Sequence, residues 1–514
     1  MSSVSRPHKW RRRLLIAVPT FLVVLILLIG GLFTWAYVGA TVSTVGSTEF
    51  TNPLAIPPLA DSQVRPDGTR VFELDMRVGR KEFRPGQQTD TWGFNGDYLG
   101  PTLRAKRGEK VEVLVRNGLP EASTVHWHGM HLPASQDGGP HQMVAAGASW
   151  TPRWTIDQPA ASLWYHPHPH GVTEQHVRRG LAGMFLLDDD VSESLPLPKN
   201  YGVDDLPVIV QDVKFRGGQL DSSHGIFRDV GFLGDQTMVN GTLSPYREVG
   251  DELIRLRLLN ASTARTYTFG FADDRAFSLI ATDGGFTERP IALNRLRMSP
   301  GERAEIVVRM RAGERTVLRG YPVEAGLDFW NQRFSGGDDT FDILQLRAAE
   351  KLRPATELPP TLATPETPDG SDSVKERRFE LNLSGINGTP MKMDRIDMTV
   401  TRGTAETWVV RNDDGMPHNF HVHDVQFRVL TVDGAAPPPE LTGPKDTVFV
   451  PPNGTVTLAM RFTGPADPNS PYMYHCHLLW HEDQGMMGQF VVVEPGQSAG
   501  QPPPSEPAQH RKHH

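Results

Sequence analysis

The sequence predicts an all-β protein of three tandem β-sandwich or β-barrel domains, preceded by one N-terminal membrane-spanning helix. Three observations lead to this prediction. The 514 residues include 49 glycines and 43 prolines, which favours many short strands separated by turns over long helices. One strand-like pattern occurs three times at long period, and a long uncharged segment stands near the N-terminus.

The N-terminal element is the segment 14–37, 24 residues without a charged side chain. A secretory signal has an apolar region of about 7–15 residues, whereas about 20 apolar residues span a bilayer. We therefore expect a single membrane anchor with an extracytoplasmic main body, because the five preceding cations should remain in the cytoplasm: Arg6, Lys9, Arg11, Arg12 and Arg13. The alternative is an exported chain, since Arg12-Arg13-Leu14-Leu15 resembles a twin-arginine signal and Val38-Gly39-Ala40 resembles a cleavage site.

Three glycine-led segments define the repeat. GEKVEVLVRN begins at Gly108, GDELIRLRLLN at Gly250 and GTAETWVVRN at Gly403, at intervals of 142 and 153 residues. Each combines a glycine turn, a strand rich in apolar residues and a closing Asn, which predicts sandwiches or barrels. The expected organisation is 1–45 for the basic stub and anchor, 46–195 and 196–352 for two domains, 353–375 for a linker, 376–497 for the third domain and 498–514 for a disordered tail.

The charge of the chain excludes one class of partner. The net charge is −8, and without the five N-terminal cations the rest of the chain carries about −13. Because no basic patch stands out, we expect no nucleic-acid partner.

Four His-x-His pairs follow strands of the first and third repeats, and the second repeat has none: His126 and His128, His166 and His168, His421 and His423, His475 and His477. In an extended chain side chains alternate, so each pair points two imidazoles the same way. Eight neutral imidazoles suit copper, zinc, iron or nickel. The pairs therefore predict a metal cluster where the first and last domains meet, in a roughly ring-like arrangement of the three domains. Three nearby histidines exceed this ligand set and are expected behind it or at the surface: His131, His141 and His170.

Cys476, the only cysteine, lies between two of these histidines. It has no partner for an intramolecular disulfide, and alternation turns its side chain away from His475 and His477. His418, His481 and Met486 lie at suitable offsets, and one Cys, two His and an axial Met form a blue-copper electron-transfer site. The pattern predicts an electron path from this site through Cys476 to the cluster.

The chain resembles the three-domain multicopper oxidases, the laccase-like group that includes bacterial copper-efflux oxidases. The resemblance covers about residues 50–497 and is carried by HWHG (126–129), WYHPHPHG (164–171), HNFHVH (418–423) and HCHLLWHEDQGMM (475–487). It implies cupredoxin-like Greek-key β-barrel domains, dioxygen as acceptor and four copper ions per chain.

The resemblance also assigns roles. His418, Cys476, His481 and Met486 would hold the type 1 copper, His126 and His421 the type 2 copper, and His128, His166, His168, His423, His475 and His477 the type 3 pair. Asp137 and Glu482 match the family's positions for proton relay. Asn419 and Asp424 depart from a common Pro and a common Gly; neither departure removes a ligand, but the resemblance then does not define the shape of the substrate-side rim.

The expected function is a laccase-like oxidase of phenols or aromatic amines. Copper-efflux oxidases carry a methionine-rich insertion before the third domain, and residues 351–384 contain no methionine. Asp414 and Met416 stand where a substrate metal could be held, so a cuprous, ferrous or manganous ion oxidase involved in copper tolerance is an alternative. A non-catalytic scaffold of the cell envelope would keep this fold without the ligands, and a zinc hydrolase would not explain the lone cysteine.

Overall fold

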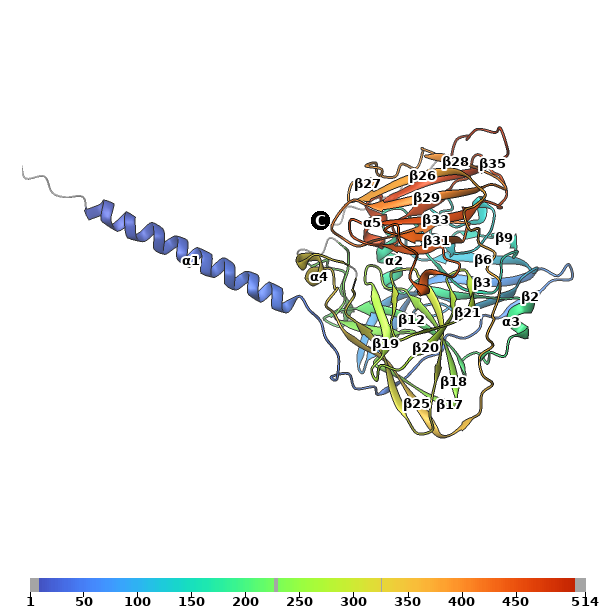
Figure 1. Cartoon of the computed structure of the whole chain (residues 1–514), viewed down its shortest axis with the longest axis horizontal. Helices are drawn as coiled ribbons and strands as arrows, with labels where there is room; N and C mark the ends of the chain where they lie inside the picture. Colours follow the sequence, from blue (N-terminus) through green and yellow to red (C-terminus); the bar gives the residue numbers. More distant parts are fainter. Residues whose placement is uncertain (1–8, 226–229, 325, 504–514) are drawn as a thin grey trace, which may run out of the picture.

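Most strands of the protein lie in three pairs of facing β-sheets, each pair enclosing its own apolar core. The computed structural model describes residues 9–225, 230–324 and 326–503. Figure 1 shows α1 (Lys9–Gly39) extending away from this β-rich body, which the three sandwiches form together. The predicted all-β fold with one apolar N-terminal helix is confirmed. The start of the predicted cytoplasmic stub and the end of the predicted tail lie outside the described residues.

The first sandwich encloses a core with Phe72, Trp127 and Phe185. One sheet contains β2 (Ser62–Val64), β3 (Arg70–Arg84), β6 (Lys110–Gly118) and β8 (Ser149–Trp150), joined by β4 (Gln87–Phe94) and β9 (Arg153–Thr155). The other contains β5 (Leu103–Lys106), β11 (Gly183–Asp188), β10 (Ala161–His166) and β7 (His126–His128). The short helices α2 (Thr173–Arg179) and α3 (Asp190–Ser194) flank β11 in the sequence.

The second sandwich encloses a core with Phe269, Ile306 and Phe341. One sheet runs β16 (Thr242–Leu243), β15 (Gln236–Val239), β12 (Asp205–Val213), β18 (Leu253–Asn260), β23 (Arg303–Arg309), β20 (Phe277–Thr282) and β21 (Gly285–Leu293). The other runs β1 (Asn52–Pro53), β17 (Pro245–Asp251), β25 (Phe341–Arg353), β24 (Arg315–Tyr321), β19 (Tyr267–Phe271) and β22 (Leu296–Met298). A hairpin of β13 (Phe215–Arg216) and β14 (Gln219–Leu220) and helix α4 (Phe329–Phe334) lie outside these sheets.

The third sandwich encloses a core with Trp408, Phe420 and Phe490. One sheet runs β27 (Gly385–Ile386), β26 (Ser373–Asn382), β29 (Ala405–Asn412), β33 (Thr455–Arg461) and β31 (Phe427–Val432). The other runs β28 (Met398–Thr401), β35 (Met487–Val493), β34 (Tyr472–His475), β30 (His418–Val422) and β32 (Thr447–Val450). Helix α5 (Leu479–Asp483) follows β34.

The threefold repeat seen in the sequence is also a repeat of contacts. β6, β18 and β29 each pair in parallel with the first long strand of their sandwich, namely β3, β12 and β26. The closing Asn of each repeat makes the same turn, because its Oδ1 accepts a hydrogen bond from the backbone N–H two residues later: Asn117, Asn260 and Asn412. The sequence repeat therefore marks three copies of one fold unit.

Each sandwich contacts both others, which supports the predicted ring-like arrangement. Ser162 on β10 donates a hydrogen bond to Glu305 on β23, 2.6 Å apart. Asp483 on α5 accepts from the backbone N–H of Thr173 on α2 at 2.8 Å. Thr282 at the end of β20 donates to the backbone oxygen of Pro444, 2.6 Å away, just before β32. These contacts bring the first and third sandwiches together although they are far apart in the sequence.

Candidate metal centre

Strand pairing brings the four His-x-His pairs together. His126 on β7 is in register with His166 at the end of β10, and His421 on β30 is in register with His475 at the end of β34. Alternation along each strand then turns both histidines of a pair toward one side. All eight side chains are at most 1 % exposed: His126, His128, His166, His168, His421, His423, His475 and His477.

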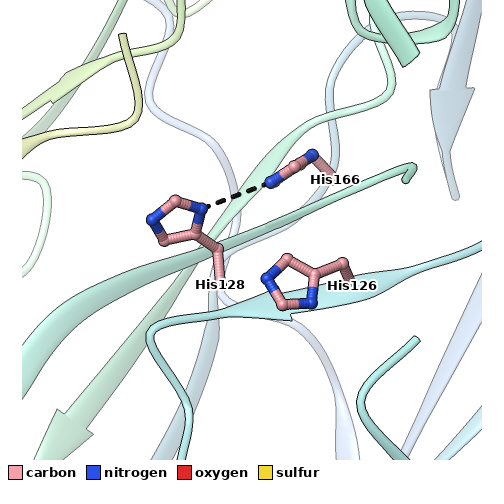
Figure 2. Close-up of side chains that lie close together, drawn as sticks. All are labelled: His126, His128 and His166. Atoms are coloured by element: carbon pink, nitrogen blue, oxygen red, sulfur yellow. Dashed lines mark hydrogen bonds between the residues drawn. The ribbon is translucent and has the colours of Figure 1, made fainter. Parts of the chain in front are cut away.

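The imidazoles of the first and third sandwiches meet at close range. His168 Nε2 lies 3.1 Å from His475 Nε2, although the residues are 307 positions apart, and His423 Nε2 lies 3.3 Å from the same atom. Figure 2 shows three rings of the first sandwich facing one another, with His128 Nδ1 3.4 Å from His166 Nε2. The eight predicted histidines thus form one cluster between two sandwiches.

Hydrogen bonds behind the rings fix which nitrogen faces the cluster. His126 Nδ1 lies 3.0 Å from the backbone oxygen of Asp137, and His421 Nδ1 lies 2.8 Å from that of Asp446. Because a carbonyl oxygen only accepts, each Nδ1 carries the proton and each Nε2 keeps its lone pair. Within the described chain both Nε2 atoms are buried without a hydrogen-bond partner. Such orphaned acceptors are costly in a dry interior, and a metal ion would satisfy them, so the residues fit a bound metal.

Burial and mutual proximity keep the imidazoles neutral. Burial lowers the pKa of His128, His421 and His423 well below 6.5, and neighbouring imidazoles lower it further. Burial likewise lowers the pKa of His168 to about 3. Neutral imidazole is the form that binds metal, so the cluster is prepared for ligation at neutral pH.

Two buried carboxylates lie directly behind the cluster. Asp137 Oδ2 accepts a hydrogen bond from His423 Nδ1 at 2.7 Å. Glu482 has one oxygen 3.1 Å from His475 Nδ1 and the other 3.4 Å from His168 Nδ1. Burial would raise the pKa of Glu482, but His168 and His475 hold it well below its ordinary value. At 2 % and 1 % exposure, Asp137 and Glu482 touch the cluster and are not solvated loop acids.

Sequence reasoning missed Asp446, a third buried acid at the cluster. Its Oδ1 accepts a hydrogen bond from His128 Nε2 at 3.1 Å, which leaves Nδ1 of that ring to face the cluster. Arg303 donates to both carboxylate oxygens, at 2.7 and 2.6 Å, and to the backbone oxygen of Ser162 at 3.0 Å. One guanidinium therefore joins the second sandwich to the other two. No motif marks this contact, because Asp446 lies 318 residues from His128 and 143 from Arg303.

The glycine after His128 has a role in this packing. Gly129 adopts a φ of +85°, and a Cβ there would lie 2.6 Å from both Arg303 Nη2 and Asp446 Oδ2. A larger residue would separate the charges that support the cluster, so the HWHG motif requires its Gly for steric reasons.

A second group of ligands lies within the third sandwich. Cys476 Sγ is 3.6 Å from Nδ1 of His418 and 3.6 Å from Nδ1 of His481, and these nitrogens are 3.0 Å apart. Cys476 belongs to the apolar core of the sandwich, on the opposite side of the chain from the clustered rings of His475 and His477. The thiol and the cluster are therefore linked through neighbouring residues of one strand end.

This group favours the ionised thiol. Burial would lower the pKa of His418, but the hydrogen bond to Asp414 and the neighbouring sulfur raise it to about 9. Burial would raise the pKa of Cys476, but hydrogen bonds with His418 and His481 lower it to about 5. The thiolate is the form that binds a soft metal, so this site also fits the predicted ligand chemistry.

The two adjacent methionines occupy different environments. Met486 is 2 % exposed and packs in the same core as Cys476, whose N–H donates to the backbone oxygen of Met486 at 3.1 Å. Met487 packs instead with Met391 and Met473 in a separate cluster. This arrangement favours Met486 over Met487 as the axial ligand.

Asp414 and Met416 lie beside the mononuclear site, in the turn before β30. The carboxylate of Asp414 accepts a hydrogen bond from His418 Nε2 at 3.0 Å, and Met416 is 8 % exposed. The Asp414 oxygen is therefore already hydrogen-bonded to His418, and the Met416 thioether is covered. Neither group is open to a substrate metal ion.

The two residues that depart from the family pattern, Asn419 and Asp424, are both buried. Asn419 is 0 % exposed; its Oδ1 accepts from the N–H of His477 at 2.6 Å, and its Nδ2 donates to the backbone oxygen of Pro300 at 2.8 Å. Asp424 is 4 % exposed, and burial raises its pKa to about 7. Asn419 thus ties the segment between the two sites to the second sandwich, a role that its position in the motif did not indicate.

Two of the extra histidines have other contacts. His141 Nε2 lies 2.5 Å from Gln489 Oε1, and His131 Nδ1 lies 3.8 Å from Asp157. Both are half-buried, as expected of residues outside the ligand set.

One site with Cys, His and Met side chains lies one residue away in the sequence from a cluster of imidazoles. This combination is typical of copper proteins that have one electron-transfer site and one polynuclear site. Three models described as multicopper oxidase match residues 76–192, 219–323 and 357–496. The chain therefore belongs to the multicopper oxidase family, and family membership implies copper binding.

The relatives differ in the functions for which they are named. The chain is 38 % identical over 449 residues to the cell division protein FtsP of Salmonella typhimurium, covering 86 % of this chain and 92 % of that one. It is 35 % identical to the multicopper oxidase mco of Staphylococcus haemolyticus, covering 87 % and 94 %. A laccase-like multicopper oxidase CueO from a lignin-degrading Ochrobactrum sp. superposes with a TM-score of 0.78 at 37 % identity, covering 86 % and 100 %.

Proposed function

We propose that the protein is a copper-dependent oxidase that couples four one-electron substrate oxidations to the reduction of dioxygen to two waters. The observation that carries this proposal is the complete set of buried ligand side chains, which gather at two interior sites. Copper bound there would supply single-electron acceptance at one ion and four-electron reduction of dioxygen at three others. Dioxygen and a small organic reductant are the proposed substrates.

The proposed ligand roles are those that the resemblance to the multicopper oxidases implies, and the grouping of the side chains is compatible with them. His418, Cys476, His481 and Met486 would hold the mononuclear type 1 ion. His126 and His421, whose Nε2 atoms lack hydrogen-bond partners in the described structure, would hold the type 2 ion. The remaining six would hold the type 3 pair: His128, His166, His168, His423, His475 and His477. The proposed total is four copper ions per chain.

Asp137 and Glu482 would relay protons. Reduction of dioxygen to water takes up four protons, so groups that can accept protons and pass them on must reach the cluster. Both carboxylates lie against Nδ1 atoms of cluster histidines, within 2.7–3.4 Å. Each would keep its partner ring oriented and pass a proton toward the space that the rings enclose.

We propose phenols or aromatic amines as the reductants, with electrons entering at the edge of His418 or His481. The similarity to a structure named for laccase-like activity supports this substrate class. Cuprous oxidation would be secondary, because Asp414 is bonded to His418 and Met416 is covered.

A non-catalytic role in the cell envelope is the second candidate. It is favoured by one observation, the 38 % identity to proteins named for cell division. Such a role would not require twelve buried ligand side chains gathered at two sites. A measurement of copper-dependent oxygen consumption distinguishes the two candidate functions.

We also propose that α1 anchors the protein in the cell membrane, with the sandwiches on the extracytoplasmic side. Its residues Ile16–Gly39 are long enough to cross a bilayer, and an 18-residue stretch within them has a mean hydropathy of 2.7. A signal sequence can have the same length and composition as this helix. The aromatic contacts of α1 with α4 favour a helix that stays attached to the protein.

The test is oxygen consumption by the copper-loaded full-length protein. We expect a methoxyphenol to be oxidised without added free copper and a stabilised cuprous complex to be oxidised more slowly. Phenol oxidation that requires extra copper, together with much faster cuprous oxidation, would favour the metal oxidase. No oxygen consumption with either reductant by the copper-loaded protein would favour the scaffold.

A further inference from the structure

The last turns of α1 pack against the body of the protein through aromatic rings. Phe33 stacks on Trp330 with ring centroids 5.7 Å apart, and Tyr37 stacks on Phe329 at 5.0 Å. The guanidinium of Arg333 lies 4.2 Å from the centre of the Tyr37 ring. Figure 1 shows this junction, where α1 reaches the body beside α4. The second sandwich therefore receives the helix on α4 through specific contacts, and a cleavage after Ala40 would remove half of each ring pair.

Helix α4 in turn contacts the turn that supports the mononuclear site. Its Asn331 donates a hydrogen bond to the backbone oxygen of Gly415 at 2.9 Å. Gly415 lies between Met416 and Asp414, and Asp414 is the residue that accepts from His418 Nε2 at 3.0 Å. Only a few direct contacts therefore separate the apolar helix from a ligand of the electron-entry site.

The end of α1 also indicates where the lipid interface lies. The apolar stretch extends to Gly39, and its last turns hold Trp35 and Tyr37, the residue types that concentrate at membrane interfaces. Trp35 is 74 % exposed and Phe329 on α4 is 65 % exposed. Large exposed aromatic rings at the end of a spanning helix are suited to the headgroup region of a bilayer, so α4 would lie at that depth.

We propose that α1 and α4 hold the mononuclear site at the extracytoplasmic surface of the cell membrane. We also propose that the reductant of this site is a hydroquinone dissolved in the lipid. This inference rests on the proposed oxidase function and narrows its substrate class. Two hydroquinones would each lose two O–H protons and two electrons to become quinones. One dioxygen would take up the four electrons and four protons, so that its O–O bond breaks and two waters form. A phenolic head at the interface reaches the His418 side while an apolar tail stays in the bilayer.

The seating can be tested without activity. The full-length protein in vesicles with lipids brominated near the headgroup should show quenched tryptophan fluorescence, and Trp330→Phe should remove part of the quenched signal. Trp150→Phe, in the first sandwich, is the matched control and should leave the quenched part unchanged. If Trp330→Phe also leaves it unchanged while Trp35→Phe reduces it, α1 spans the membrane without seating α4, and the proposal is wrong.

The substrate class is tested with the same full-length protein in vesicles, using a long-chain hydroquinone and a water-soluble one. Phe329→Ser and Tyr37→Ala should reduce the rate on the long-chain hydroquinone roughly tenfold, because the site loses its high local substrate concentration. The rate on the soluble hydroquinone should stay unchanged, since neither residue belongs to the metal sites. Equal losses on both, or no loss on the long-chain substrate, would overturn this inference alone. Failure of the wild type to oxidise either one would contradict the proposed oxidase function as well.

Discussion

The two proposed metal-binding regions of the molecule are built in opposite ways. The mononuclear site takes its four side chains from residues 418–486, all within the third sandwich. The cluster takes its eight histidines from the first and third sandwiches, with His168 and His475 307 residues apart. One region can form in a single fold unit, whereas the other requires the sandwiches to dock correctly.

The second sandwich explains how docking is secured although it contributes no cluster ligand. Arg303 reaches Ser162 beside one group of histidines and Asp446 beside the other, with its side chain fully buried. Glu305, two residues later, binds Ser162 and the guanidinium of Arg257. The middle domain therefore acts as a charged brace for the cluster, whereas all four proposed ligands of the mononuclear site come from the third sandwich.

The largest effect should come from the acids behind the cluster. Asp137→Asn and Glu482→Gln should slow turnover by about 10²–10⁴-fold, the usual range for loss of a positioned proton donor. The blue absorption should persist in both, because neither acid touches Cys476. Glu494→Gln, at an exposed position, is the control and should leave turnover unchanged. Wild-type turnover in both variants would remove these acids from the account.

Loss of the Arg303–Asp446 ion pair should affect the cluster and leave the mononuclear site intact. Arg303→Met leaves the buried Asp446 carboxylate without its partner, which typically costs about 3–5 kcal/mol of unfolding free energy. We expect weaker copper binding at the cluster and an intact blue band. Arg353→Met breaks an ion pair in which the Arg side chain is 65 % exposed, and should cost much less. Denaturant unfolding checks both variants, and similar losses in the two would contradict the bracing role of Arg303.

The stability that Glu305 gives to the interface between the first and second sandwiches should decrease at acidic pH. Burial would raise the pKa of Glu305, but Arg255 and Arg257 lower it from 4.5 to about 2. A carboxyl with a lowered pKa stabilises the fold above its unfolded pKa and loses this effect as pH falls through the folded one. At pH 7, Glu305→Gln should therefore lower the unfolding free energy by about 3 kcal/mol, and the difference from wild type should shrink between pH 4.5 and 2. A difference that stays constant across this range would show that Glu305 does not titrate as described.

The smallest change concerns the mononuclear site alone. Met486→Leu should raise its reduction potential without loss of copper, because the axial ligand tunes a blue-copper site. Met487→Leu is the matched control, since Met487 packs in a different cluster. If redox titration shows a raised reduction potential for Met487→Leu and not for Met486→Leu, Met487 is the axial ligand instead.

The same contrast explains what the sequence could predict. The repeated strands and the histidine pairs are periodic patterns, so the fold class, the convergence of eight rings and the separate direction of Cys476 followed from alternation along strands. Asp446 and Arg303 could not be predicted, because their contact depends on how three domains dock and no local spacing encodes it. The contacts of Asn419 could not be predicted either, since its buried partners Ser299 and Pro300 lie in another domain.

Copper analysis of the wild-type protein and of Cys476→Ser tests most directly whether the two regions are independent sites. The account predicts four copper ions and an intense blue band for the wild type. It predicts three ions, no blue band and no oxidase activity for the variant, because the serine hydroxyl is a hard, poorly ionised ligand and the eight histidines are untouched. A variant that loses all its copper, or one that keeps the blue band and wild-type activity, would contradict the account.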